Sequence, residues 1–186
     1  MSQLYLLAFV PPVANDGKFH EIQVSVDREG VTVSHRRGWR ASTEDDQLVA
    51  KTLAAAGMEA TDNPLDIRVE EIGREKDTSG ELKVDIMVRV PISKLVLLPG
   101  TKTHDGATSL CLVIRDDQER LSKVYREAFP VTVPDDQLAR ALAGAAGLRK
   151  VLQMRKGGGL IAIGVRDDVA NVVSTAVLRV EPTAKR

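Results

Sequence analysis

The sequence is poor in several of the residues that functional sites use. Aromatic residues make up only 3% of the 186 residues, and Cys111 is the single cysteine. One cysteine excludes an internal disulfide and a cysteine-rich metal site, and few aromatic rings leave few platforms on which bases or sugars can stack. Net charge is also absent, because 26 basic and 26 acidic residues balance. A polyanion requires a surplus of basic groups, so we expect no nucleic-acid partner.

Long hydrophobic runs are missing as well. No apolar stretch approaches the roughly 18 to 20 residues that cross a bilayer, so we expect no membrane insertion. Residues 4–13 are mostly apolar, but no basic residue precedes them and they contain Pro11 and Pro12, so we expect no signal peptide there. With 43% hydrophobic and 28% charged residues, the composition predicts a soluble globular protein with one main domain.

The first 41 residues predict a β-meander. Ile22, Val24 and Val26 alternate with polar residues, and a period of two is typical of a half-buried strand. Strands are predicted over residues 4–10, 19–26 and 31–35, with turns around Gly17 and Gly30. The last strand ends in a basic tip, Arg36-Arg37-Gly38-Trp39-Arg40.

Residues 42–63 predict a short linker helix. Ser42 and Thr43 precede two acidic residues, which is a helix N-cap signal, and Gly57 can end the helix. The apolar residues and threonine that recur at helical spacing between them are Leu48, Val49, Thr52, Leu53 and Ala56. Residues 62–64, Asp-Asn-Pro, break regular structure, so the main domain is predicted to begin at residue 64.

Residues 64–182 predict a mainly β domain, an antiparallel sandwich, followed by a disordered tail at 183–186. Short strands separated by Gly, Pro and Asp turns are typical of that architecture. The clearest alternation runs from Leu82 to Val90. The other predicted strands are 65–71, 93–98, 109–115, 121–133, 160–165 and 172–180. After Pro134, the alanine-rich stretch with Leu138, Leu142 and Ala145 on one face predicts a short helical insertion between strands.

Three segments of the N-terminal part carry a resemblance to a known family. They are residues 4–12 (Leu-Tyr-Leu-Leu-Ala-Phe-Val-Pro-Pro), residues 16–24 (Asp-Gly-Lys-Phe-His-Glu-Ile-Gln-Val) and residues 36–39 (Arg-Arg-Gly-Trp). Their succession resembles the C-terminal part of bacterial von Willebrand factor type A-related proteins of the acidobacterial type, in which tyrosine usually stands at the position of Trp39. The region that follows resembles an immunoglobulin-like β-sandwich, and that fold is therefore expected for residues 64–182.

The resemblance does not extend to the family's metal site. That site needs an Asp-x-Ser-x-Ser loop, and the nearest string here, residues 77–81, reads Asp-Thr-Ser-Gly-Glu. No metal ligand is carried over to any residue. The resemblance implies instead that the chain is part of a longer periplasmic or secreted precursor whose metal-binding domain lies upstream.

No motif nominates a catalytic residue or a cofactor, so we expect no enzyme activity. Asp116-Asp117 and Asp167-Asp168 offer clustered oxygens for calcium, but they lack calcium-loop spacing, and turn formation explains them better. Gly157-Gly158-Gly159 leads into a strand, which favours a flexible hairpin turn over a phosphate loop. His20, His35 and His104 have no ligand spacing, and Cys111 is typical of a buried small hydrophobe.

The remaining candidate contact residues are Arg36, Arg37, Trp39 and Arg40. A second basic segment contains Arg140, Arg149, Lys150, Arg155 and Lys156. Solvated surface is the simpler interpretation of both. The leading hypothesis is a non-enzymatic protein-interaction or scaffolding module that contacts an upstream von Willebrand A-like domain or another protein, with homo-oligomerisation through an exposed strand edge. The alternative is a stand-alone carbohydrate- or small-ligand-binding sandwich that uses Trp39 and Tyr125.

Overall fold

The computed structural model describes residues 6–10, 15–76, 81–155 and 157–182. Strands make up 48% and helices 15% of the structure, which confirms the predicted mainly β class. The chain forms two compact units, Met1–Gln47 and Leu48–Arg186. No helix among the described residues is long and apolar enough to cross a membrane. The predicted tail at 183–186 lies outside the described residues.

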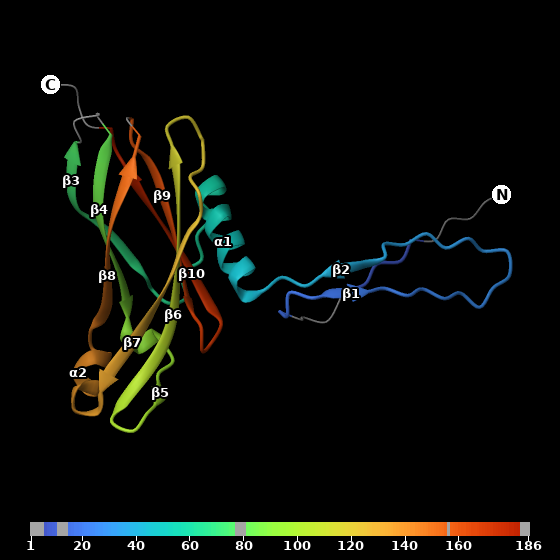
Figure 1. Ribbon diagram of the computed structural model, residues 1–186, viewed down its shortest axis with the longest axis horizontal. Coiled ribbons are helices and arrows are strands. Elements are labelled where there is room, and N and C mark those ends of the chain that lie inside the picture. Colours follow the sequence, from blue (N-terminus) through green and yellow to red (C-terminus); the bar gives the residue numbers. More distant parts are fainter. Residues whose placement is uncertain (1–5, 11–14, 77–80, 156, 183–186) are drawn as a thin grey trace. The chain divides into compact units, whose positions relative to one another are not determined.

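The N-terminal unit contains one antiparallel strand pair (Figure 1), formed by β1 (Phe19–Glu21) and β2 (Gly38–Arg40). Phe19 lies opposite Arg40 and His20 opposite Trp39. The pairing continues on both sides, because the Ile22 amide donates to the Arg37 carbonyl and the Ala41 amide to the Lys18 carbonyl, each at 2.9 Å.

A hairpin therefore replaces the predicted three-strand meander. Residues 31–35, predicted as a strand, are not in one, and the basic tip forms β2 instead. Gly38 allows this pairing, because a Cβ at that position would lie 2.2 Å from the His20 carbonyl oxygen and 2.5 Å from the Phe19 ring. Residues 6–10 of the first predicted strand are also outside any strand, and residues 4 and 5 lie outside the described residues.

The second unit is a sandwich of two antiparallel sheets. The smaller sheet has the order β3 (Arg68–Lys76), β4 (Leu82–Pro91), β8 (Ala145–Met154). The larger sheet has the order β10 (Val172–Val180), β9 (Gly159–Asp167), β6 (Thr103–Asp116), and β6 also pairs with β7 (Tyr125–Pro134) and with the short β5 (Leu98–Pro99). Some consecutive strands pair within one sheet, such as β9 and β10, whereas β8 and β9 lie in different sheets.

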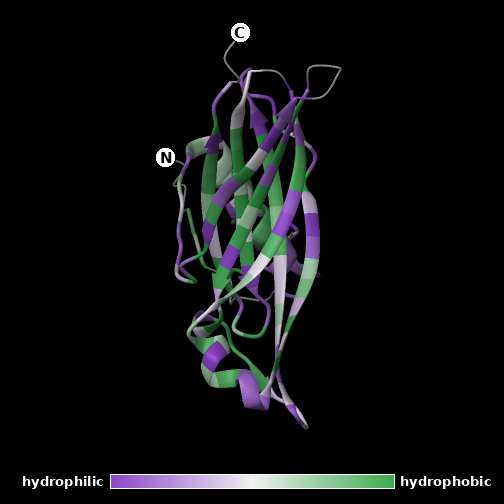
Figure 2. Cartoon of the chain, turned by 90° about the vertical axis from the view of Figure 1, so that its left-hand side faces the viewer, coloured by the Kyte–Doolittle hydropathy of each residue, from purple (hydrophilic) through white to green (hydrophobic). Residues whose placement is uncertain are grey.

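The hydrophobic core lies between the two sheets. Alternate residues of each central strand point inward, for example Val84, Ile86 and Val88 on β4, and all three are fully buried. On β9 the inward residues are Ile161 and Ile163. Figure 2 shows the corresponding bands of hydrophobic and hydrophilic residues along the strands of the sandwich.

Helix α1 (Glu44–Met58) covers the outer face of the larger sheet. Its buried residues Ala55 and Ala56 pack on the outward residues Val113 of β6 and Ala162 of β9. Strand β9 is consequently buried on both faces, which explains why it reads as a continuous apolar run rather than an alternation. The predicted linker helix is thus also a packed layer of the sandwich unit.

The start of α1 matches the predicted N-cap. The Thr43 hydroxyl accepts a hydrogen bond from the Asp46 amide (3.0 Å), and the Asp46 carboxylate accepts one from the Thr43 amide (2.9 Å). These reciprocal bonds form a capping box with aspartate at its third position. Glu59, just after the helix, has a φ of 54°, and its amide donates to the Ala55 carbonyl.

The predicted helical insertion is present between β7 and β8. It consists of a 3₁₀ turn, η2 (Asp135–Gln137), and the short α2 (Leu138–Leu142). Leu138 and Ala141 pack against the core, whereas Leu142 is exposed and Ala145 begins β8. The predicted strand at 93–98 is mostly replaced by another 3₁₀ turn, η1 (Ile92–Lys94), with only β5 remaining.

Candidate functional site

The predicted contact residues lie in and beside β2. Trp39 is partly buried and stacks on His20, with ring centroids 4.7 Å apart and an interplanar angle of 20°. His20 is in turn held by Asp16, with 3.1 Å between its Nε2 and the carboxylate Oδ1. One face of the indole is therefore covered from within the hairpin. The turn and the basic tip that carry the family resemblance contact each other here.

Asp16 organises the turn before β1. Its carboxylate accepts a hydrogen bond from the Lys18 amide (3.0 Å), and this bond, followed by the one with His20, lowers the pKa of Asp16 below its ordinary value. The hairpin is thus best held together when Asp16 is ionised.

The four predicted contact residues do not form one patch. Successive side chains of a strand point to opposite faces, so Trp39 and Arg40 lie on different faces of the hairpin. Arg36 and Arg37 lie just before β2, with a bend at residue 37, so the alternation of β2 does not assign them to either face. The Arg40 guanidinium also donates to the Gly17 carbonyl at 3.4 Å. The sequence prediction identified these residues but not the placement of Trp39 and Arg40 on opposite faces.

The hairpin also exposes apolar residues, which the sequence prediction assigned to a core. Val24, Val26, Val31 and Val33 are each exposed, and each limb places its two valines at alternate positions. Upstream, both Leu6 and Leu7 are exposed, at 93% and 86%. Most of the large apolar residues described in the N-terminal unit are therefore exposed, whereas the sandwich has a buried core.

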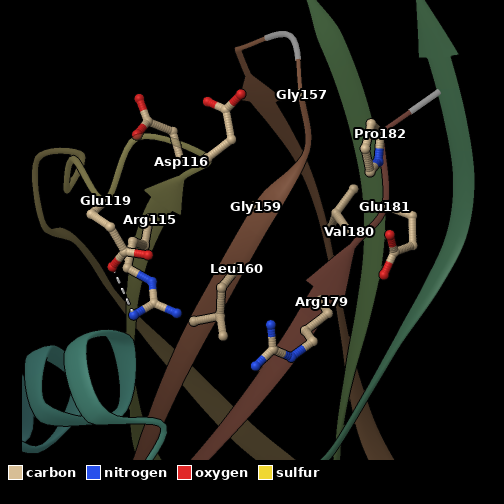
Figure 3. Close-up of a pocket in the computed structure, with 11 residues that line it drawn as sticks. Arg115, Asp116, Glu119, Gly157, Gly159, Leu160, Arg179, Val180, Glu181 and Pro182 are labelled. Atoms are coloured by element: carbon tan, nitrogen blue, oxygen red, sulfur yellow. Dashed lines mark ion pairs between the residues drawn. The ribbon is translucent and has the colours of Figure 1, made fainter. Parts of the chain in front are cut away.

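A polar cavity of about 210 Å³ lies at one end of the sandwich (Figure 3). Its walls come from β6, from the turn between β8 and β9, and from the end of β10, and they include Arg115, Asp116 and Arg179. The charges pair with each other or with nearby residues. Asp116 accepts hydrogen bonds from the amides of Gln118 and Arg120 and from the Arg120 guanidinium, and the Arg120 amide is the main reason that the pKa of Asp116 is lowered.

The three glycines beside this cavity serve close packing rather than flexibility. Gly158 has a φ of 78°, and a Cβ there would lie 2.2 Å from the Val180 carbonyl oxygen. A Cβ at Gly159 would lie 2.3 Å from the Arg115 carbonyl oxygen. They form the predicted turn, but backbone from β6 and β10 approaches too closely for any side chain.

Glu59 anchors the end of α1 at the same place. Its carboxylate pairs with Arg115 (3.0 Å) and with Arg179, and Arg115 also donates to the carbonyl of Gly57 (3.2 Å). Arg115 also pairs with Glu119. These ion pairs hold the helix on the sheet and involve the cavity residues Arg115, Glu119 and Arg179.

We expect Glu59→Ala to lower the free energy of unfolding by about 1–2 kcal/mol, because it leaves the largely buried Arg115 with fewer partners. Glu59→Gly should cost about 0.5–1 kcal/mol less, since glycine accepts the positive φ of this position. Urea unfolding followed by circular dichroism measures both. Equal losses for the two variants would show that backbone strain is negligible here.

The described residues contain no group of three or more histidine, cysteine or acidic side chains arranged to hold a metal ion. Asp167 is buried and accepts hydrogen bonds from the amides of Val96, Val169 and Ala170, and Asp168 pairs with Arg166. The hydrogen bonds and ion pairs of Asp116, Asp167 and Asp168 within the protein agree with the interpretation of these residues as parts of turns. Residues 77–80, compared above with the Asp-x-Ser-x-Ser loop, lie outside the described residues.

Two residues of the second basic segment, Arg149 and Lys150, form ion pairs within the sandwich. Arg149 on β8 forms an ion pair with Asp85 on β4, and Lys150 pairs with Glu127 on β7 and lies 5.5 Å from the Tyr125 ring centroid. Glu127 raises the pKa of Lys150, and Arg149 lowers that of Asp85. The acidic partners are on β4 and β7, far from β8 in the sequence, so no local sequence pattern indicates them. Lys156 lies outside the described residues.

The remaining candidates have ordinary surroundings. Cys111 is fully buried between Leu48 of α1 and Val173 of β10, and burial raises the pKa of its thiol. His104 lies 3.1 Å from Asp135, and His35 bonds to the carbonyl of Arg36 (2.8 Å).

Comparison with known proteins gives little. No protein-family model matches the chain, and no curated protein matches it. Among solved structures, the X-ray structure of Northeast Structural Genomics Consortium target SoR45 is similar over 67% of this chain and 87% of that chain, with 13% sequence identity and a TM-score of 0.38.

Proposed function

We propose that this chain is a non-enzymatic protein-interaction module of a larger extracytoplasmic protein related to von Willebrand factor type A. In this proposal, the N-terminal unit packs through its exposed apolar residues against a von Willebrand A-like domain. The sandwich is the accessory domain that follows. Its mechanism is surface complementarity, with no bond made or broken.

One observation carries the proposal, namely the contrast between the two units. The sandwich has a complete core of fully buried side chains such as Ile86 and Ile163. The hairpin leaves valines exposed at alternate positions of both limbs, from Val24 to Val33. Apolar side chains in that pattern are those of a sheet face that packs on another layer. The choice of partner depends on the resemblance of residues 4–39 to the von Willebrand factor type A-related family.

The coding DNA upstream of Met1 provides the test. We expect the reading frame to continue into a domain with an Asp-x-Ser-x-Ser loop. When the joined protein is expressed, amide hydrogen exchange at residues 19–40 should slow by about tenfold or more relative to this chain alone, because docking removes local opening. A frame that stops just before Met1, or unchanged exchange in the joined protein, would overturn the proposal.

The exposed valines also predict self-association of this chain in isolation. Light scattering should show a mass that rises with concentration, and the double variant Val24→Lys, Val33→Lys should remain monomeric over a range at least about tenfold higher, since like charges oppose the packing of the two apolar faces. Val169→Lys, in the turn between β9 and β10, is the matched exposed control. Equal association of all three proteins would show that this face is not the contact.

The alternative proposal, a carbohydrate-binding sandwich, has a separate test. Trp39 and Tyr125 would be its contact residues, and binding of oligosaccharides that is lost in Trp39→Ala would favour it. The His20 ring already covers one face of Trp39, so the present arrangement supports protein contact better.

A further inference from the structure

Strand β2 has one edge paired with β1 and one edge without a partner strand among the described residues. In an antiparallel pair, residues alternate between those whose backbone groups point to the partner strand and those whose groups point away. The hydrogen bonds of the Arg37 carbonyl and the Ala41 amide place residues 37, 39 and 41 in the first class. The amide and carbonyl groups of Gly38 and Arg40 therefore point to the outer edge.

The charge along this edge has one sign. From residue 31 to residue 40 the sequence contains Arg36, Arg37 and Arg40 and no acidic residue. All three arginines are exposed. Arg40 belongs to β2, and Arg36 and Arg37 lie directly before it, with a bend at residue 37.

A strand added to this edge would contact both the outward backbone groups and the arginine side chains. Its backbone would pair with the outward groups of Gly38 and Arg40. One of its side chains would lie beside Arg40 as a cross-strand neighbour, and its continuation would pass near Arg36 and Arg37. Opposite charges at such positions are favourable, and like charges are unfavourable. Gly38 has no side chain that would hinder the approach.

We propose that the outer edge of β2 binds an extended acidic protein segment by strand addition, with one acidic side chain beside Arg40 and another near Arg36 and Arg37. This inference rests on the proposed function, because it names the chemistry of a protein partner of the N-terminal unit. It uses the strand edge, however, whereas the proposed function uses the apolar face of the same hairpin.

A synthetic peptide, Thr-Glu-Val-Thr-Val-Glu-Thr, is the probe. Trp39 is the only tryptophan of the chain, so its fluorescence reports on β2 alone, and the NMR amide signals of Gly38 and Arg40 provide a second measurement. We expect saturable changes in the Gly38 and Arg40 signals. The same peptide with lysine in place of glutamate should bind at least about tenfold more weakly, from two charge pairs worth about threefold each.

Two peptides with N-methyl groups on alternate backbone nitrogens, one in each phase, test strand pairing on the unaltered protein. One phase should abolish binding and the other should be tolerated, because only every second amide of an added strand faces β2. The variant Arg36→Gln, Arg40→Gln should weaken binding of the unmethylated peptide by about tenfold.

Three results would overturn the proposal. They are no signal change at millimolar peptide, equal binding of both methylated peptides, and equally tight binding of a short DNA duplex at the same edge, which would indicate general attraction of polyanions. The variant Val24→Lys, Val33→Lys separates this proposal from the proposed function. It should lose contact through the apolar face and still bind the peptide, so either proposal can fail alone.

Discussion

Replacing Ile163 by alanine should lower the free energy of unfolding by about 3–4 kcal/mol. Ile163 is fully buried on β9 and lies opposite Leu112 of β6 and Ala176 of β10. Truncation removes apolar contacts and leaves a cavity in a strand that is covered on both faces, so the surroundings have little freedom to collapse. This position combines complete burial with a central place in the larger sheet.

The measurement requires a signal from the sandwich itself. Trp39 belongs to the N-terminal unit, so tryptophan fluorescence does not follow this unfolding, and far-ultraviolet circular dichroism in urea is the suitable probe. Val169→Ala, on the exposed turn after β9, is the control and should cost no more than about 0.5 kcal/mol. A loss below about 1 kcal/mol for Ile163→Ala would contradict the described core.

The second large effect is expected at the contact between α1 and the outer face of β9. A Cβ at Gly164 would lie 2.1 Å from the hydroxyl oxygen of Thr52 and 3.0 Å from a methyl carbon of Leu48. Gly164→Ala should therefore cost about 2 kcal/mol, since overpacking exceeds the roughly 0.5–1 kcal/mol that alanine gains over glycine in a strand. Urea unfolding by circular dichroism measures this loss.

Thr52 supplies a rescue experiment for that prediction. Thr52→Ala removes the hydroxyl that collides and also a hydrogen bond of 2.8 Å to the Leu48 carbonyl. The double variant should be at least about 1 kcal/mol more stable than the sum of the single losses, because the two sites interact directly. Thr52→Ser retains the hydroxyl and should give no rescue. Strict additivity with Thr52→Ala would argue against the packing of α1 on β9.

Sequence patterns predicted the sandwich well because its strands obey local rules. The alternation from Leu82 to Val90 reports directly that β4 is buried on one face. The N-cap of α1 was visible for the same reason, since Thr43 and Asp46 are three residues apart. The covered outer face of β9 was not visible, because it depends on a helix about 100 residues earlier in the chain.

The candidate site was predictable only as a set of residues. Arg36, Arg37, Trp39 and Arg40 were proposed from their chemistry, but the placement of Trp39 and Arg40 on opposite faces depends on the pairing of β2 with β1, which the close approach at Gly38 permits. The prediction placed a third strand at residues 31–35, because valines at alternate positions have the same pattern whether or not a partner covers them. The alternating pattern shows which face of a strand is apolar. It does not show which part of the protein, if any, covers that face.

The covering of the larger sheet by α1 has a practical consequence for dividing this protein into fragments. The boundary between the two units falls after Gln47. Further along, the Asp62 amide donates a hydrogen bond to the Thr175 hydroxyl of β10, and the Asp62 carbonyl accepts one from the Thr175 amide. A recombinant fragment that starts at residue 64, at the end of the Asp-Asn-Pro sequence, would lack α1. Val113, Leu160 and Ala162 would then be exposed to water. Such a fragment would carry an exposed apolar patch on the outer face of its larger sheet. That patch should make it poorly soluble, although all of its strands are present.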